Sequence, residues 1–144
     1  MSNEEVNETV VARIREDPFA RLLKADVEVL GLGHAIARLT VRDEMLNFHG
    51  ITHGGVVFAL SDVAFGAASN SHGYKAVALS VDISFRRPTG TGDRLMAEAR
   101  EVHAGGRTAL YQIDVVNEET GELIARCQNL VYRTREPLVP GVPE

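Results

Sequence analysis

The sequence predicts one α+β domain in which a long central helix is wrapped by a curved antiparallel sheet of about five to six strands, preceded by a short N-terminal helix. Residues 56–69 have helical length and carry one charge, Asp62, and a helix that is apolar on all sides is expected to be buried on all sides. Four long β-prone runs follow this segment through short links, which indicate antiparallel neighbours. A chain of 144 residues with 44% hydrophobic residues is large enough for one such core.

The chain before the central helix is predicted to form two short helices and two strands. An apolar stripe at helical spacing over residues 10–14 predicts one helix, and Asp17 followed by Pro18 is typical of the first turn of another. Alternating polarity predicts a half-buried strand over residues 24–32 and a second strand over residues 34–42.

The β-prone runs after the central helix are separated by clusters of turn residues and complete the predicted sheet. They cover residues 76–87, 93–103, 107–117 and 122–133. A tail with three prolines follows and is expected to be flexible. We therefore divide the chain into a polar helical extension (residues 1–18), one domain (residues 19–135) and a flexible Pro-rich tail (residues 136–144).

Composition and charge argue against several classes of function. A net charge of −5 argues against a nucleic-acid partner, since such proteins usually present a basic stripe. The apolar segment is too short and too isolated to span a membrane. The single Cys127 cannot form an intramolecular disulfide, and the polar, acidic N-terminus does not resemble a secretory signal. We therefore expect a cytoplasmic protein.

The loop before the central helix carries the most specific motif. Residues 47–55 read N-x-x-G-x-x-H-G-G, and Asp62 follows eight residues after Gly54. A helix with this loop and this acid, wrapped by such a sheet, resembles the hotdog-fold acyl-CoA thioesterases, and among them the subfamily named for the phenylacetate degradation pathway. The resemblance covers roughly residues 19–133. It implies a hotdog fold and thioester hydrolysis.

Gly54 stands where a thioester hydrolase needs a hydrogen-bond donor. The carbonyl oxygen becomes negative during hydrolysis, and backbone N–H groups at a helix N-terminus stabilise such charge. In the resembled family the matching glycine amide polarises the thioester carbonyl, and the resemblance implies this role for Gly54 and substrate contact for Gly55. On the residues alone, the two glycines also fit a tight turn.

Asp62 is the candidate nucleophile or general base. A buried carboxylate needs either a dedicated partner or a function, so a hydrogen-bonded core Asp is the alternative. Eight residues of helix separate Asp62 from Gly54 by about 12 Å along the axis. One chain cannot place both groups on the same carbonyl, so the working pair requires two chains with antiparallel helices across a two-fold axis. We expect a homodimer with shared active sites, or a tetramer of paired dimers.

Asn47 and Ser80 match pocket residues of the resembled family. The resemblance implies that the Asn47 amide holds the attacking water or the thioester, and that Ser80 orients the water or the acid. His53 precedes the donor glycine and is a candidate to position the carbonyl or the loop. The alternatives are a turn-forming Asn, an ordinary strand Ser and a structural His. Glycines around His49 and His53 interrupt any helix through both, and no third ligand is evident, so no metal or cofactor is expected.

Coenzyme A carries phosphates that need cations near the mouth of the site. Arg107 and Thr108 follow a glycine turn, and G-R-T resembles the family's nucleotide-contacting turn. Arg86 and Arg87 end the first strand after the central helix and rank below them as phosphate ligands. All three arginines also fit solvated strand ends.

The leading hypothesis is an acyl-CoA thioesterase that hydrolyses aryl or short- to medium-chain acyl-CoA to the free acid and coenzyme A. Two alternatives stay open, namely a hotdog hydroxyacyl-thioester dehydratase or hydratase and a non-catalytic acyl-CoA binding protein. Release of free thiol separates the first hypothesis from the others, and hydration of an enoyl thioester identifies the second.

Overall fold

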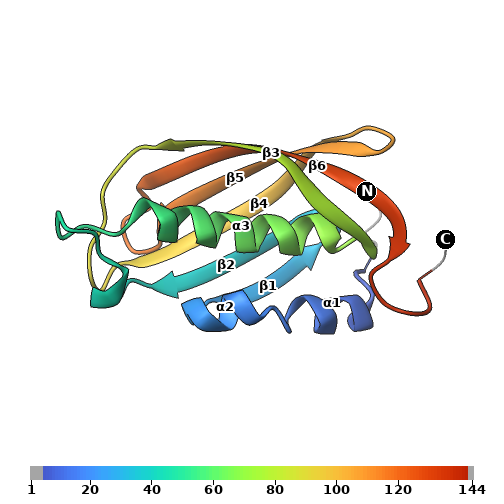
Figure 1. Ribbon diagram of the computed structural model, residues 1–144, viewed down its shortest axis with the longest axis horizontal. Helices are drawn as coiled ribbons and strands as arrows, with labels where there is room; N and C mark the ends of the chain where they lie inside the picture. The colour runs from blue at the N-terminus through green and yellow to red at the C-terminus, as the bar shows by residue number, and fades with distance from the viewer. Residues whose placement is uncertain (1–4, 143–144) are drawn as a thin grey trace.

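The computed structural model describes residues 5–142 and folds them into one six-stranded antiparallel sheet that curves around a central helix (Figure 1). The strand order is β1-β2-β4-β5-β6-β3, and every neighbouring pair is antiparallel. The predicted architecture is thereby confirmed. In chain order the elements are α1 (Glu8–Ile14), α2 (Pro18–Leu23), β1 (Asp26–Gly31), β2 (His34–Thr40), a 3-10 turn (Asp43–Met45), α3 (Gly54–Asn70), β3 (Tyr74–Phe85), β4 (Arg94–Ala104), β5 (Thr108–Asn117) and β6 (Leu123–Pro137).

The helix α3 packs closely on the sheet because the facing strands carry small side chains. Alanines of β2 and β4, among them Ala37 and Ala97, are fully buried. Leu60 and Phe65 of α3 are also buried and belong to the same hydrophobic core. Phe65 packs edge-on against Tyr111 of β5, with ring centroids 5.5 Å apart. Within the described part of the chain, no helix combines the length and hydrophobicity needed to cross a bilayer.

One face of α3 is not covered by the rest of the chain. Gly55, Phe58 and Asp62 lie three and four residues apart, which places them on the same side of the helix, and all three are exposed. The exposed fraction of Phe58 is 38%. The prediction that the helix is buried on all sides is therefore wrong for the single chain, because the sheet covers the helix from one side only.

The strand β3 forms one edge of the sheet. It pairs with β6, and no other described strand lies beyond it. Three of its apolar side chains, Val77, Leu79 and Phe85, are each more than half exposed. A strand edge with unpaired backbone groups and apolar side chains is a surface that proteins normally cover.

The ends of the chain pack onto the domain. α1 and α2 are the two short helices that the sequence predicts. β6 continues to Pro137, beyond the predicted run, because it pairs with the start of β3 at Tyr74. The Leu138 N–H then donates to the Gly73 carbonyl at 2.8 Å, and Val139 is buried. Residues 1–4 of the predicted extension and 143–144 of the predicted tail lie outside the described residues, and the predicted domain boundaries stay predictions.

Candidate active site

The loop of residues 47–53 is held in place by hydrogen bonds. The Asn47 N–H donates to the Ile51 carbonyl at 2.8 Å, and the side-chain oxygen of Asn47 accepts two N–H groups of the same loop at 2.9 and 3.4 Å. The Thr89 hydroxyl donates to the Thr52 hydroxyl at 2.7 Å and ties the loop to the segment after β3. Asn47 therefore shapes the loop with its oxygen, while its side-chain nitrogen bonds to no other described residue.

His53 caps α3 and leaves one amide free at the start of the helix. The Nδ1 atom of His53 accepts the Gly55 N–H at 2.9 Å. Since Nδ1 is an acceptor, the neutral ring carries its proton on Nε2. The Gly54 N–H makes no hydrogen bond within residues 5–142 and lies in the first turn, at the positive end of the helix dipole.

The end of β3 lies beside the start of α3. A Cβ atom on Gly54 would sit 3.4 Å from the Phe85 ring. Arg87 pairs with Glu122 at 3.0 Å, and Arg86 is exposed. The loop before α3, the start of α3 and the end of β3 therefore lie at one end of the sheet (Figure 1). These segments, with the two residues after β3, carry six of the predicted site residues, namely Asn47, His53, Gly54, Gly55, Arg86 and Arg87.

Asp62 lies in the middle of α3, and its carboxylate forms no hydrogen bond or ion pair with another described residue. It therefore lacks the dedicated partner that a structural core Asp requires. Desolvation by the surrounding apolar surface raises the pKa of the Asp62 carboxyl, and the nearby Asp17 carboxylate raises it further.

The side chain next to Asp62 faces into the core. The Ser61 hydroxyl donates to the Cys127 sulfur at 3.0 Å, and both residues are buried. Burial raises the pKa of the Cys127 thiol. Neither side chain is therefore placed to act as a nucleophile, because neither reaches the surface and the thiol stays protonated.

Gly54 and Asp62 do not meet within one chain. Eight residues of α3 separate them, which corresponds to about 12 Å along the helix axis. Ser80 lies on the edge strand β3, is exposed, and follows a register shift at Ala78. Asp62 and Ser80 thus both lie on surface that the single chain leaves open.

Arg107 and Thr108 lie at the opposite end of the molecule, at the turn between β4 and β5 (Figure 1). The Arg107 guanidinium donates to the Tyr132 hydroxyl at 2.8 Å. A cavity of about 1030 Å³ opens here near the C-terminal end of α3, and Arg107, Arg133 and Arg135 line it. Guanidinium groups match the geometry of phosphate oxygens, so this basic lining suits an anionic ligand.

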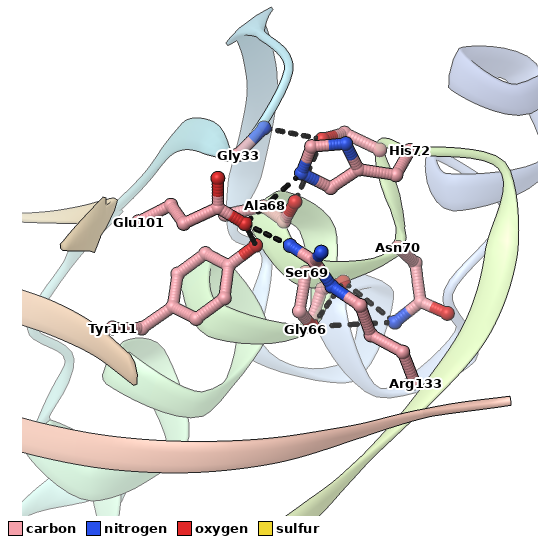
Figure 2. A network of polar contacts seen from close by, with 10 residues as sticks. Gly33, Gly66, Ala68, Ser69, Asn70, His72, Glu101, Tyr111 and Arg133 are labelled. Carbon is pink, nitrogen blue, oxygen red and sulfur yellow. Dashed lines mark hydrogen bonds and ion pairs between the residues drawn. The ribbon is translucent and has the colours of Figure 1, made fainter. Parts of the chain in front are cut away.

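A polar network at the C-terminal end of α3 was not anticipated from the sequence (Figure 2). Glu101 accepts a hydrogen bond from the Tyr111 hydroxyl at 3.1 Å, lies 3.2 Å from the His72 ring nitrogen, and pairs with Arg133. Desolvation and the Glu101 charge raise the pKa of Tyr111, which keeps its hydroxyl protonated as a donor. These residues come from four separate segments and belong to no local motif, so no sequence signal links them.

The side chains that could ligate a metal ion do not cluster in the described part of the chain. Among residues 5–142, no three His, Cys, Asp or Glu side chains lie close enough together to hold a metal ion. His49 lies in the loop and His53 is the residue that caps α3, so the two do not share a helix.

A long helix wrapped by a six-stranded antiparallel sheet is the architecture of the hotdog class of proteins. Residues 49–124 match the model of the thioesterase superfamily, and the chain belongs to this family. The chain is 41% identical to the acyl-coenzyme A thioesterase PaaI of Escherichia coli over 108 residues, which span 75% of this chain and 77% of that protein.

Solved structures agree with this assignment. The E. coli PaaI protein of the phenylacetic acid degradation operon superposes with a TM-score of 0.83 at 36% identity, covering 88% of this chain and 91% of that one. A Streptococcus mutans protein bound to acetyl CoA superposes with a TM-score of 0.73 at 31% identity, covering 78% and 90%. The predicted hotdog fold and the phenylacetate-degradation-type subfamily are confirmed.

Proposed function

We propose that this chain hydrolyses acyl-CoA thioesters with aryl or short- to medium-chain acyl groups to the free acid and coenzyme A. One arrangement carries the proposal, namely an unpaired Gly54 N–H at the start of α3 and an unpaired Asp62 carboxylate on the open face of the same helix. The first is the donor that a developing oxyanion requires, and the second is the base or nucleophile that hydrolysis requires. Its raised pKa makes Asp62 a stronger base than an ordinary Asp.

Two chains must supply these groups, because one helix holds them too far apart. If Asp62 of one chain lies beside the partner's Gly54, and the reverse, the two-fold axis passes between the two α3 helices beside Phe58, the residue halfway between these two. Phe58 is exposed on the same face of α3, so two phenylalanines would meet at the axis. The apolar edge of β3 would be covered by the same contact. The proposed unit is therefore a homodimer with two shared sites, either alone or as half of a tetramer.

In such a site the chemistry follows from the two groups. The thioester oxygen accepts the Gly54 N–H, and this hydrogen bond and the positive end of α3 stabilise the negative charge that develops on the oxygen. Asp62 either takes a proton from a water that adds to the carbonyl carbon, or adds to that carbon itself and forms an anhydride that water then hydrolyses. In both routes the carbon–sulfur bond breaks, and coenzyme A leaves as a thiolate that is then protonated.

The residues around this pair have supporting roles in the proposal. His53 accepts the Gly55 N–H at its Nδ1 and makes no hydrogen bond with the Gly54 N–H, so the Gly54 N–H stays available as the donor to the substrate. Gly55 exposes its backbone to the substrate. The side-chain nitrogen of Asn47 is available to the attacking water or the thioester, and Ser80 orients the water or the acid from the edge strand.

Arg107 and Thr108 are proposed to hold the phosphates of coenzyme A. With antiparallel helices the partner's α3 begins beside Asp62, so the C-terminal end of α3, where the basic cavity lies, extends past the partner's Gly54. Arg86 and Arg87 rank second, because Arg87 is already paired with Glu122. The E. coli relative is named an acyl-CoA thioesterase and the S. mutans relative binds acetyl CoA, which supports the same ligand here.

The test measures free thiol released from a panel of acyl-CoA thioesters by the wild type and by Asp62→Asn. We expect the wild type to release thiol and the variant to be at least about a hundredfold slower, the usual scale for a general base. No release by the folded wild type would overturn the proposal, and hydration of an enoyl thioester would assign the dehydratase class instead. Undiminished release by a folded Asp62→Asn protein would remove Asp62 from the mechanism.

A stability measurement keeps loss of activity separate from loss of fold. The pKa of Asp62 is raised in the folded chain, so its ionised form costs stability at neutral pH, and this cost disappears as the pH falls below the ordinary Asp pKa. Asp62→Asn removes the charge. The variant should therefore melt at or above the wild-type temperature at pH 7, with the difference shrinking toward pH 4.

A further inference from the structure

A second pocket, of about 490 Å³, lies between α3 and the N-terminal segment that carries α1 and α2. Its volume falls within the roughly 300–1,000 Å³ of small-molecule sites. Apart from Leu138, which follows β6, the apolar part of its lining is made by Ile14, Pro18, Val27, Val63, Gly66 and Ala67. These residues come from the α1–α2 segment, β1 and α3, so the N-terminal helices form one wall of the pocket.

This pocket adjoins the proposed catalytic carboxylate. Val63 directly follows Asp62, and Gly66 lies one turn further on the same face of α3, about 6 Å along the axis. Asp17, which also lines the pocket, is near enough for its charge to raise the pKa of Asp62. The pocket therefore lies within about one helical turn of a thioester carbonyl that is held at Asp62.

Gly66 leaves space where a helix normally presents a side chain. A Cβ atom on Gly66 would have no neighbour within 4 Å, and the backbone there does not adopt a positive φ. Neither packing nor conformation within the chain requires glycine, although glycine is less favourable than alanine inside a helix. The Gly66 carbonyl accepts the Asn70 side-chain N–H at 2.9 Å, which fixes the last turn of α3 beside the pocket (Figure 2).

We propose that this pocket receives the acyl group of the thioester, so that Gly66 and the α1–α2 segment determine which acyl groups are hydrolysed. The inference rests on the proposed function and names the part of the site that selects the substrate. The family match begins at residue 49, so one wall of this pocket lies outside the matched part of the chain.

The lining also indicates which acyl groups are accepted. Apolar walls favour uncharged aryl and short to medium aliphatic groups. Arg13 pairs with Glu16 at 3.7 Å, whereas Asp17 and Asp62 have no ion pair among the described residues. These two carboxylates disfavour an acyl group that ends in a carboxylate, because like charges repel in a partly desolvated site.

The test fills the pocket, enlarges it, and compares ratios of kcat/KM. Gly66→Leu places a side chain in the open space of the pocket, and Ile14→Ala enlarges the opposite wall. Gly31→Leu is the matched control, since a Cβ on Gly31 also has no neighbour within 4 Å and this residue ends β1 outside the pocket. Each variant is assayed with acetyl-CoA, phenylacetyl-CoA, hexanoyl-CoA and a succinyl thioester, and its folding is checked by circular dichroism.

Gly66→Leu should lower the ratio of kcat/KM for phenylacetyl-CoA or hexanoyl-CoA relative to acetyl-CoA by about tenfold or more. Ile14→Ala should shift the preference toward longer acyl chains, and Gly31→Leu should leave the ratios unchanged. For the wild type, the succinyl thioester should be hydrolysed more slowly than phenylacetyl-CoA and hexanoyl-CoA. Active variants with wild-type ratios would overturn the acyl pocket while the proposed function stands, whereas a wild type without thioesterase activity would overturn the proposed function itself. If Gly66→Leu does not fold, unchanged ratios in folded Ile14→Ala decide against the pocket.

Discussion

Replacing Gly54 by proline removes the proposed donor while preserving the local backbone. Gly54 is the first residue of α3, where proline is favoured because the N–H it lacks has no intrahelical partner. His53 already has the extended conformation that must precede a proline, with φ −58° and ψ 133°. Gly54→Ala is the matched control, since it adds a Cβ atom 3.4 Å from the Phe85 ring but keeps the N–H.

The size of the effect follows from the role of the donor. Loss of one oxyanion-stabilising hydrogen bond lowers kcat by about 10²–10³-fold. We expect this loss in Gly54→Pro and a much smaller one in Gly54→Ala, measured as thiol release at saturating acyl-CoA. Equal kcat values in the two folded variants would show that the Gly54 amide does not contact the developing oxyanion.

Mixing Gly54→Pro chains with Asp62→Asn chains then tests whether the two groups act in one shared site. In a mixed dimer one site receives both defects and the other receives neither. If subunits pair at random, half of the dimers are mixed and each has one intact site of two, so about a quarter of the wild-type activity should return. Mixed dimers, identified with a mass tag on one parent, that stay as inactive as the parents would refute the shared site.

Two further predictions concern the acid and the ligand. Asp17→Asn keeps the cap of α2, because Asn caps helices as well as Asp does, but removes a charge that helps to raise the pKa of Asp62. The acid limb of the pH profile of kcat/KM should therefore move to lower pH, and an unmoved limb would show that another group titrates. Arg107→Ala should raise KM for acyl-CoA with little change in kcat, since a remote phosphate is held equally in ground and transition states. A KM unchanged for acyl-CoA, or raised equally for a pantetheine thioester without the nucleotide, would contradict the assignment.

The fold was predictable because its elements carry local signals. The strands show alternation or β-prone composition bounded by turn residues, and the central helix is a long apolar segment after a glycine-rich loop. Composition did not indicate which face of α3 the sheet leaves open, and only the Gly54–Asp62 separation pointed to a face that meets a second chain. An apolar segment has the same composition whether its own sheet or another chain covers it, so Phe58 gave no sign of its exposure.

In the candidate site too, local signals were predictable from the sequence, whereas contacts between distant segments were not. Residues of the 47–55 motif were identified from the sequence because they are contiguous, and the structure shows how His53 leaves the Gly54 N–H free. The second pocket was not identifiable, because Ile14, Val27 and Gly66 meet only after packing. From the sequence alone, Gly66 is recognisable only as a residue with low helix propensity.

The burial of Cys127 has a practical consequence for colorimetric thiol detection. It is the one cysteine of the chain, it is fully buried against Ser61, and burial raises the pKa of its thiol. Disulfide reagents react with thiolates, so the folded protein adds almost no background and the colour reports coenzyme A. An unfolded chain exposes Cys127 and gains one reactive equivalent, so the same reagent without substrate counts the unfolded fraction of each variant.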